Sequence, residues 1–163
     1  MGWRRAFREQ ARSDDGVRRL LNDPRVAYSH RLHYLQMVTE KLAKSFTVVD
    51  DPAATPRGSH VVLVRFLRSL KSAPQMHVAL GFANRSAAFS AYIDSVVGLA
   101  EQIQRLAPSE AGFDHPNPEY PWRNRGDGRV IAPCDHAFAM FDPASTRMAR
   151  FEKLLAALLR YGG

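Results

Sequence analysis

Histidine and acidic residues in this sequence lack the spacing of a metal site. A carboxylate-bridged di-iron site in a helical bundle needs Glu followed by His at the third position on two helices, and this pattern does not occur. His30 and His33 lie one helical turn apart and could supply half of a zinc site, but no second pair of Cys or His has ligand spacing. The sequence therefore predicts no bound metal.

The sequence contains no convincing motif for a catalytic nucleophile or for a phosphate-binding loop. Cys134 and His136 would share one face of an extended segment, but no third residue is placed to orient the histidine. A buried or incidental cysteine is the simpler interpretation. No glycine-rich turn with the spacing of a P-loop or a dinucleotide fingerprint precedes a helix. We therefore expect no cofactor.

Positive charge is concentrated in the first part of the chain. The net charge is +7, and residues 1–71 hold 14 Lys or Arg and 7 Asp or Glu, whereas the remaining residues hold 9 of each. A basic half attracts RNA, nucleotide phosphates or an acidic partner protein. The bias toward arginine, 19 against 4 lysines, also fits a simple effect of genome composition, in which case the charge has no partner.

Helices must position these residues, because apolar side chains recur at helical spacing along most of the chain. We expect helices over 3–21 (with Gly16 as a point of interruption), about 25–48, 59–73, a short segment after 76, 86–106, and a last helix with Asp142 as N-cap. We expect the inward faces to carry Phe7, Ala11, Val17, Leu20, Leu21, Leu32, Leu35, Leu42, Phe46, Val49, Leu63, Phe66, Leu67, Leu70, Phe89, Ile93, Val96, Ala100, Ile103, Met148, Phe151, Leu155 and Leu158.

The segment 108–143 shows no helical period. Its aromatic residues, Phe113, Tyr120, Trp122 and Phe138, favour an ordered flap over disorder. The triplet "GDG" (126–128) can turn "YPWRN" back against "RVIAP" as a small β-hairpin. We therefore predict an all-α, up-and-down bundle of four to five helices, with this irregular flap before the last helix, in one domain spanning 1–163.

The single cysteine and the absence of a long apolar run indicate where the protein works. One cysteine permits no internal disulfide, and no apolar stretch approaches the roughly 18 residues of a membrane-spanning helix. We expect a cytoplasmic protein with no membrane partner.

The stretch "HYLQMVTEKLAK" (33–44) resembles a helix of the HEPN superfamily (higher eukaryote and prokaryote nucleotide-binding domain). "SHVVLVRFLRSL" is similar to the following helix and "SAAFSAYIDSVVGLAEQIQRL" to a later long one, so that the resemblance covers roughly 3–107 and the terminal helix. It implies a helical bundle, often dimeric, of the kind found in RNA-cleaving toxins and in helical partners of minimal nucleotidyltransferases. The stripe from Met148 to Leu158 is apolar enough to serve a homodimer interface.

Ribonuclease members of that superfamily carry an Arg and a His separated by four to six residues, which act on the ribose phosphate without metal. Two pairs here have this spacing, Arg25 with His30 and Arg129 with His136, although random placement of 19 arginines and 6 histidines accounts for both. The order along the chain favours Arg129 and His136 as the candidate catalytic pair. Arg25 and His30 are better interpreted as a basic entrance to a helix.

These observations predict a HEPN-like helical module that binds RNA, a nucleotide or a partner protein in a prokaryotic conflict or toxin–antitoxin type system. One alternative is a metal-independent endoribonuclease toxin, and another is a scaffold subunit without catalysis. Glu40 and Lys44 are expected to form an exposed ion pair at i, i+4. The predicted anion-binding residues are His30, Arg31, His33, Lys41, Arg65, Arg68 and Lys71.

Overall fold

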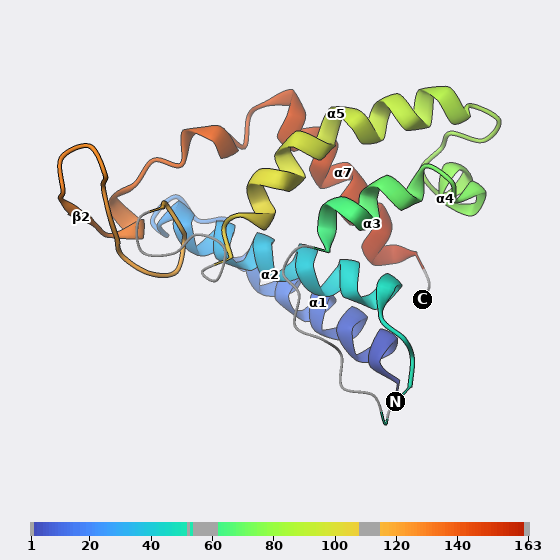
Figure 1. Ribbon diagram of the computed structural model, residues 1–163, viewed down its shortest axis with the longest axis horizontal. Coiled ribbons are helices and arrows are strands. Elements are labelled where there is room, and N and C mark those ends of the chain that lie inside the picture. Colours follow the sequence, from blue (N-terminus) through green and yellow to red (C-terminus); the bar gives the residue numbers. More distant parts are fainter. Residues whose placement is uncertain (1, 52, 54–61, 108–114, 162–163) are drawn as a thin grey trace.

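A computed structural model describes residues 2–51, 53, 62–107 and 115–161. Most of the described residues are helical (Figure 1), as the apolar spacing predicts. The six α-helices in this part of the chain are α1 (Trp3–Leu20), α2 (Tyr28–Thr47), α3 (Leu63–Leu70), α4 (Pro74–Ala79), α5 (Ser86–Gln104) and α7 (Thr146–Arg160). The prediction of an all-α bundle with a flap before its last helix is confirmed.

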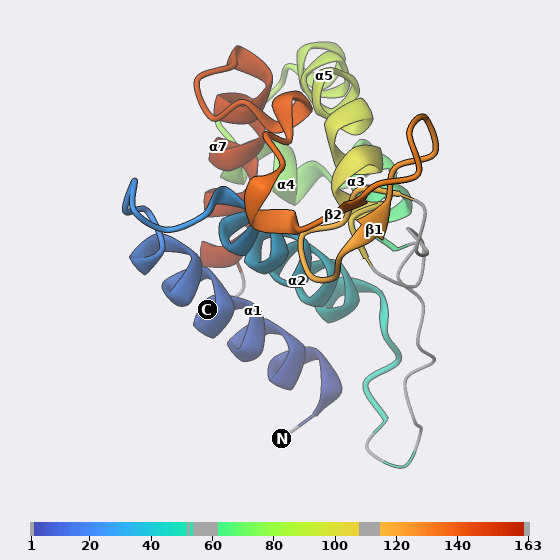
Figure 2. The ribbon, with the colours of Figure 1, turned by 90° about the vertical axis from the view of Figure 1, so that its left-hand side faces the viewer.

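Helix α2 lies at the centre of the bundle. One side of it packs along α1, which runs antiparallel to it, and the other side contacts α3, α5 and α7 (Figures 1 and 2). Helix α5 also packs against α3 and α7, and the short helix α4 contacts α5. Every larger element is therefore placed, directly or through one neighbour, by α2.

The core forms between α2 and the α3, α5 and α7 layer. On α5, Phe89, Ile93, Val96, Ala100 and Ile103 are fully buried, as predicted. The predicted inward faces of α2, α3 and α7 are confirmed in the same way. Their buried residues include Leu32, Leu35, Leu42, Leu63, Phe66, Leu67, Leu70, Met148, Phe151, Leu155 and Leu158. The apolar stripe from Met148 to Leu158, which the sequence offers as a dimer interface, is therefore part of the core. The homodimer itself stays a prediction.

Two residues predicted to face inward are exposed. Leu20, at the end of α1, is 82% exposed, and Val49, two residues beyond the end of α2, is 74% exposed. Both lie where a helix ends, so the helical period no longer determines which way the side chain points.

Several helix boundaries also differ from the prediction. Helix α1 continues through Gly16, and α2 begins at Tyr28 because the preceding residues form a turn in which Val26 N donates to Asp23 O (3.0 Å). The N-cap of α7 is Ser145, whose hydroxyl accepts from Met148 N (3.2 Å), and not Asp142. The Asp142 carboxylate instead accepts from Ala144 N (2.9 Å) in the turn before the helix.

The flap contains the predicted hairpin. Strand β1 (Trp122–Arg123) pairs antiparallel with β2 (Val130–Ile131), and the "GDG" turn lies between them. Two short 3₁₀ helices follow, η2 (Pro133–Asp135), which contacts α2, and η3 (Ala139–Phe141). Of the two interpretations of Cys134, buried or incidental, burial is excluded because Cys134 is exposed in η2, and Phe113 lies outside the described residues.

No helix in the described ranges is both long enough and apolar enough to cross a membrane.

Polar contacts attach α1 to the rest of the bundle. Its buried residues are Ala11, Asp14, Asp15 and Arg18, so three of the four are ionisable. Asp14 forms an ion pair with Lys41 of α2. Arg18 donates to Glu152 of α7 from both terminal nitrogens (2.5 and 2.9 Å) and to Asp15 (2.8 Å). Burial of these charges is tolerated because each has an oppositely charged partner.

The Arg18 contacts predict a large loss of stability on substitution. Arg18→Met should lower the free energy of unfolding by about 3 kcal/mol, the low end of the range for a broken buried pair, because Arg19 continues to pair with Asp15. Urea denaturation followed by circular dichroism measures this change. The matched control is Arg5→Met, which removes an exposed pair with Glu9 in the same helix and should leave the midpoint unchanged. Equal midpoints for the two variants would contradict the structural role of Arg18.

A basic cleft as candidate functional site

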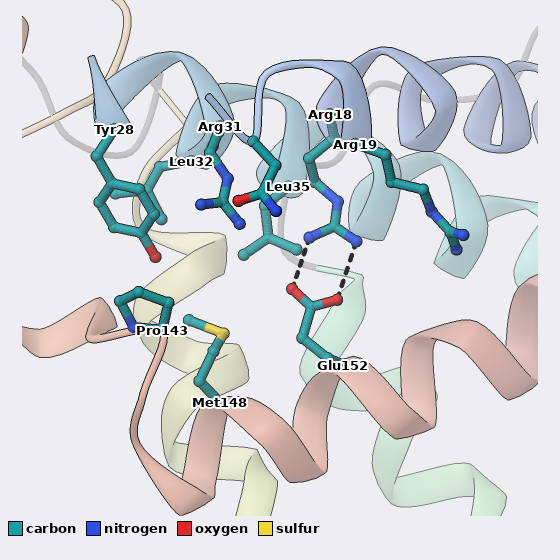
Figure 3. Close-up of a pocket in the computed structure, with 10 residues that line it drawn as sticks. Arg18, Arg19, Tyr28, Arg31, Leu32, Leu35, Pro143, Met148 and Glu152 are labelled. Atoms are coloured by element: carbon teal, nitrogen blue, oxygen red, sulfur yellow. Dashed lines mark hydrogen bonds and ion pairs between the residues drawn. The ribbon is translucent and has the colours of Figure 1, made fainter. Parts of the chain in front are cut away.

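Two adjoining hollows at the turn between α1 and α2 form one cleft that faces the start of α7. Their volumes are about 350 and 530 Å³, and they share Asn22, Tyr28 and Arg31. Figure 3 shows Arg18, Tyr28 and Arg31 projecting from α1 and α2 toward Pro143, Met148 and Glu152. Leu32, Leu35 and Arg19 complete the first hollow, and the turn residues Asp23, Pro24, Arg25, Val26 and Ala27 complete the second.

The turn that forms the outer wall of the cleft is stabilised locally. The Asp23 carboxylate accepts a hydrogen bond from the backbone N–H of Arg25 (2.8 Å) and forms an ion pair with its guanidinium (2.6 Å). Hydrogen bonds from the Arg25 side chain and backbone hold the pKa of Asp23 below its ordinary value. This is the local arrangement typical of an Asp in a turn, and it places the Arg25 side chain at the rim.

Tyr28 connects this wall to the flap. Its phenol donates to the backbone carbonyl of Phe141 (2.6 Å), so the first residue of α2 is joined to η3. Burial raises the pKa of the Tyr28 phenol, which remains a neutral donor at physiological pH. The aromatic ring also lies beneath the Arg31 guanidinium, whose carbon is 5.4 Å from the ring centroid. Tyr28 thereby orients Arg31 toward the cleft.

Arg18 forms the inner wall, and its hydrogen-bonding capacity is largely used within the protein. Burial of its guanidinium favours the neutral form, but hydrogen bonds and charges from Glu152 and Asp15 outweigh this effect and raise the pKa of Arg18. Because both oxygens of Glu152 accept from Arg18, this carboxylate does not face the cleft as an unpaired negative charge.

Arg31 differs from Arg18 because its Nε has no acceptor in the described part of the chain. Its Nε is buried, and none of the described residues accepts a hydrogen bond from this atom. A buried donor without a partner costs free energy, typically about 1–3 kcal/mol, and such groups are rare in folded proteins. Since the Arg31 side chain lines the cleft, its guanidinium could pair with a ligand that carries oxygen acceptors.

The lining of the whole cleft is positively charged. It contains four arginines, Arg18, Arg19, Arg25 and Arg31, against two carboxylates, Glu152 and Asp23. Asp15, behind the wall, pairs with both Arg18 and Arg19. Counting these three carboxylates leaves a net charge of +1, and Arg31 is the cation without a carboxylate partner. The cleft therefore favours an anion.

Four of the seven predicted anion-binding residues lie beside a carboxylate of the protein itself. Lys41 pairs with Asp14 beneath α1, Arg68 pairs with Glu101, Lys71 pairs with Asp94, and His33 lies 3.6 Å from Glu119. His30 and Arg65 are exposed on α2 and α3. Of the seven residues, Arg31 alone lines the cleft.

The Glu40–Lys44 pair has a different role from the one predicted. The pair forms, with Lys44 Nζ 2.6 Å from Glu40, but its side chains are only 15% and 11% exposed. Lys44 lies over the Phe7 ring of α1, and Gln36 also donates to Glu40 (2.9 Å). The expectation of an exposed pair is therefore wrong, because this polar side of α2 is the surface on which α1 packs.

The predicted catalytic pair does not share a pocket of this kind. The Arg129 guanidinium is exposed and pairs with Asp127 in the hairpin turn (3.1 Å). His136 packs edge-on against Trp122 and Phe138, with ring centroids 5.1 and 4.6 Å away, and lines a separate pocket to which Arg129 does not contribute. A catalytic role for the two residues stays a prediction.

Sequence analysis does not single out Arg18, Tyr28 or Glu152. The contacts between Arg18 and Glu152 and between Tyr28 and Phe141 join residues more than a hundred positions apart, so no local pattern indicates them. The one local signal is the turn sequence "NDP" (22–24), which has arginines on both sides. Within the described ranges, no group of three or more His, Cys, Asp or Glu residues is arranged to hold a metal ion.

Comparison with known proteins gives no match to a family model, to a curated protein or to a solved structure. The resemblance to the HEPN superfamily therefore rests on the residues and motifs quoted above.

The missing acceptor predicts an unusual response of stability to mutation. Arg31→Met should change the free energy of unfolding by less than about 1 kcal/mol, because its contact with the Tyr28 ring is the one interaction of the guanidinium found among the described residues. The comparison is Arg18→Met, the same substitution in the same cleft. Thermal denaturation of the two variants in parallel measures the difference, and equal destabilisation would show that Arg31 has structural partners.

Proposed function

We propose that this protein is a helical binding module that holds a phosphate group of RNA or of a nucleotide in the basic cleft at the α1–α2 turn. The observation that carries the proposal is Arg31, which lines both hollows of the cleft and whose buried Nε has no acceptor among the described residues. A phosphate offers several oxygens in a geometry that matches the planar guanidinium, and such charge-assisted hydrogen bonds are stronger than neutral ones.

The surroundings of Arg31 support a phosphate as the ligand. Arg25 and Arg19 lie at the sides of the cleft with exposed side chains, so both can approach a second phosphate or the rest of a ligand. Glu152, the carboxylate in the inner wall, is already paired with Arg18 and repels an incoming anion less than an unpaired carboxylate would.

A HEPN-like assignment is part of this proposal. The helical bundle agrees with the architecture that the resemblance implies, and α2, which carries "HYLQMVTEKLAK", supplies both Tyr28 and Arg31 from its first turn. A role in a prokaryotic conflict or toxin–antitoxin type system, with RNA or a nucleotide as the bound partner, follows from the same resemblance.

Binding without cleavage is better supported than ribonuclease activity. Cleavage by the predicted pair needs the His136 imidazole at the ribose hydroxyl and the Arg129 guanidinium at the same phosphate. Arg129 instead pairs with Asp127, and its side chain is 78% exposed.

The cleft predicts which arginine controls affinity. Arg31→Gln should weaken binding of a short fluorescein-labelled single-stranded RNA about tenfold, the effect of losing one charge-assisted hydrogen bond. Fluorescence anisotropy at low salt measures the affinity, and competition by ADP distinguishes a mononucleotide ligand from an RNA ligand. Affinity should also fall steeply with salt, because phosphate contacts release counterions.

Two control variants separate the cleft from general surface charge. Arg65→Gln removes an exposed cation of α3 that the sequence also predicts to bind anions, and Arg160→Gln removes one at the end of α7. Both should bind RNA nearly as well as the wild type. If all three variants weaken binding equally, the interaction is an effect of net charge, and the cleft has no special role.

A cleavage assay tests the ribonuclease alternative. The wild-type protein should leave a single-stranded RNA substrate intact, as seen by denaturing gel electrophoresis. Cleavage that persists in EDTA and disappears in the His136→Ala variant, with an unchanged melting temperature, would replace binding with metal-independent catalysis as the function.

A further inference from the structure

A second pocket lies beneath the flap, where the C-terminal end of α5 meets the segment around η3. Its volume is about 710 Å³, within the range of small-molecule sites. It shares no lining residue with the basic cleft. The described residues that line it are Gln102, Arg105, Leu106, His115, Pro116, His136, Ala137, Phe138, Ala139, Met140 and Phe141.

The walls of this flap pocket are aromatic and apolar. Phe138 and Phe141 are buried, His136 packs between Trp122 and Phe138, and Met140 remains 61% exposed beside them. Aromatic rings and a methionine are the side chains that pack well against a flat apolar ligand. Their arrangement favours a ligand with an aromatic body.

Phe138 adopts a backbone conformation that is uncommon for its residue type. Its φ of 44° and ψ of 46° lie in the left-handed region, which bulky residues rarely occupy. Such strain persists only where the surrounding structure enforces it, and it is frequent at ligand sites. Here it accompanies a Phe138 ring packed against His136 and Trp122 at the wall of the pocket.

The polar groups of the flap pocket come mainly from the end of α5. Gln102 Oε1 is buried and accepts no hydrogen bond from any residue of the described ranges. One turn away, Arg105 is exposed, and it is the one lining residue in those ranges with a permanent charge. A ligand could therefore place an anionic group at Arg105 and a hydrogen-bond donor at Gln102.

We propose that the flap pocket binds a small aromatic carboxylate. The aromatic body would pack against His136 and Met140, above the buried rings of Phe138 and Phe141, and the carboxylate would pair with Arg105. A single guanidinium suits a group with one negative charge, whereas a polyphosphate would need several cations. The site is distinct from the phosphate-binding cleft and does not depend on the function proposed for that cleft.

Calorimetry with one acid and its neutral analogue tests the charge at Arg105. Biphenyl-4-carboxylate should bind the full-length wild-type protein, and biphenyl-4-methanol, which has the same aromatic body, should bind about tenfold more weakly. Arg105→Gln should weaken binding of the carboxylate about tenfold and leave binding of the alcohol unchanged. The control Arg160→Gln removes an exposed arginine elsewhere and should bind both compounds as the wild type does.

Nuclear magnetic resonance locates the bound probe. The chain has two tryptophans, and the Trp3 indole nitrogen makes no hydrogen bond to a described residue, so Trp3→Phe should fold normally and identify the Trp122 indole signal. Biphenyl-4-carboxylate should shift that signal, since Trp122 packs against two residues of the pocket. No binding, equal affinity for the alcohol and the acid, or binding that leaves the Trp122 signal unchanged would each overturn the proposal.

Discussion

The ion pairs of the buried Arg18 guanidinium join the end of α1 to α7. The position of this end of α1, and with it the shape of the cleft, depends on them. A charge that is removed from water must meet opposite charges nearby, and Arg18 meets two, Asp15 in its own helix and Glu152 on α7. These partners fix the end of α1 against α7. With Lys41 and Asp14 fixing the middle of α1 on α2, the helix is held by directional contacts although its apolar face is small.

The same cleft contains an arginine in the opposite state. Each of the three guanidinium nitrogens of Arg18 has an acceptor, whereas the buried Nε of Arg31 has none among the described residues. A purely structural cation in this position would be expected to acquire a carboxylate partner, as Arg18 has. Unsatisfied buried groups are rare in folded proteins, and binding of a ligand or an ion is one of their recognised explanations. The contrast between the two side chains, rather than the net charge of the chain, is the reason for placing a ligand here.

The sequence predicts the helices and the core well because both follow from apolar spacing, which is local. It predicts the long-range polar contacts poorly. Arg18 and Glu152 are 134 residues apart, and nothing near either residue indicates the other. The polar side of α2 illustrates the same limit: the Glu40–Lys44 spacing predicts the ion pair, but only the packing of α1 shows that it is largely buried. The charge of Arg31 is enough to predict an anion-binding residue from the sequence. The missing acceptor at its Nε is visible only in the structure.

The most direct measurement of the central claim is the nuclear magnetic resonance signal of the Arg31 Nε–H group during titration with ADP, assigned by its loss in Arg31→Lys. Binding of a phosphate in the cleft should shift this signal, because Arg31 lines the cleft and its Nε has no acceptor among the described residues. The corresponding signal of Arg18 should move little, since its hydrogen bonds are already formed. An Arg31 signal that stays in place while signals of exposed arginines elsewhere shift would contradict the proposal of a phosphate site in the cleft.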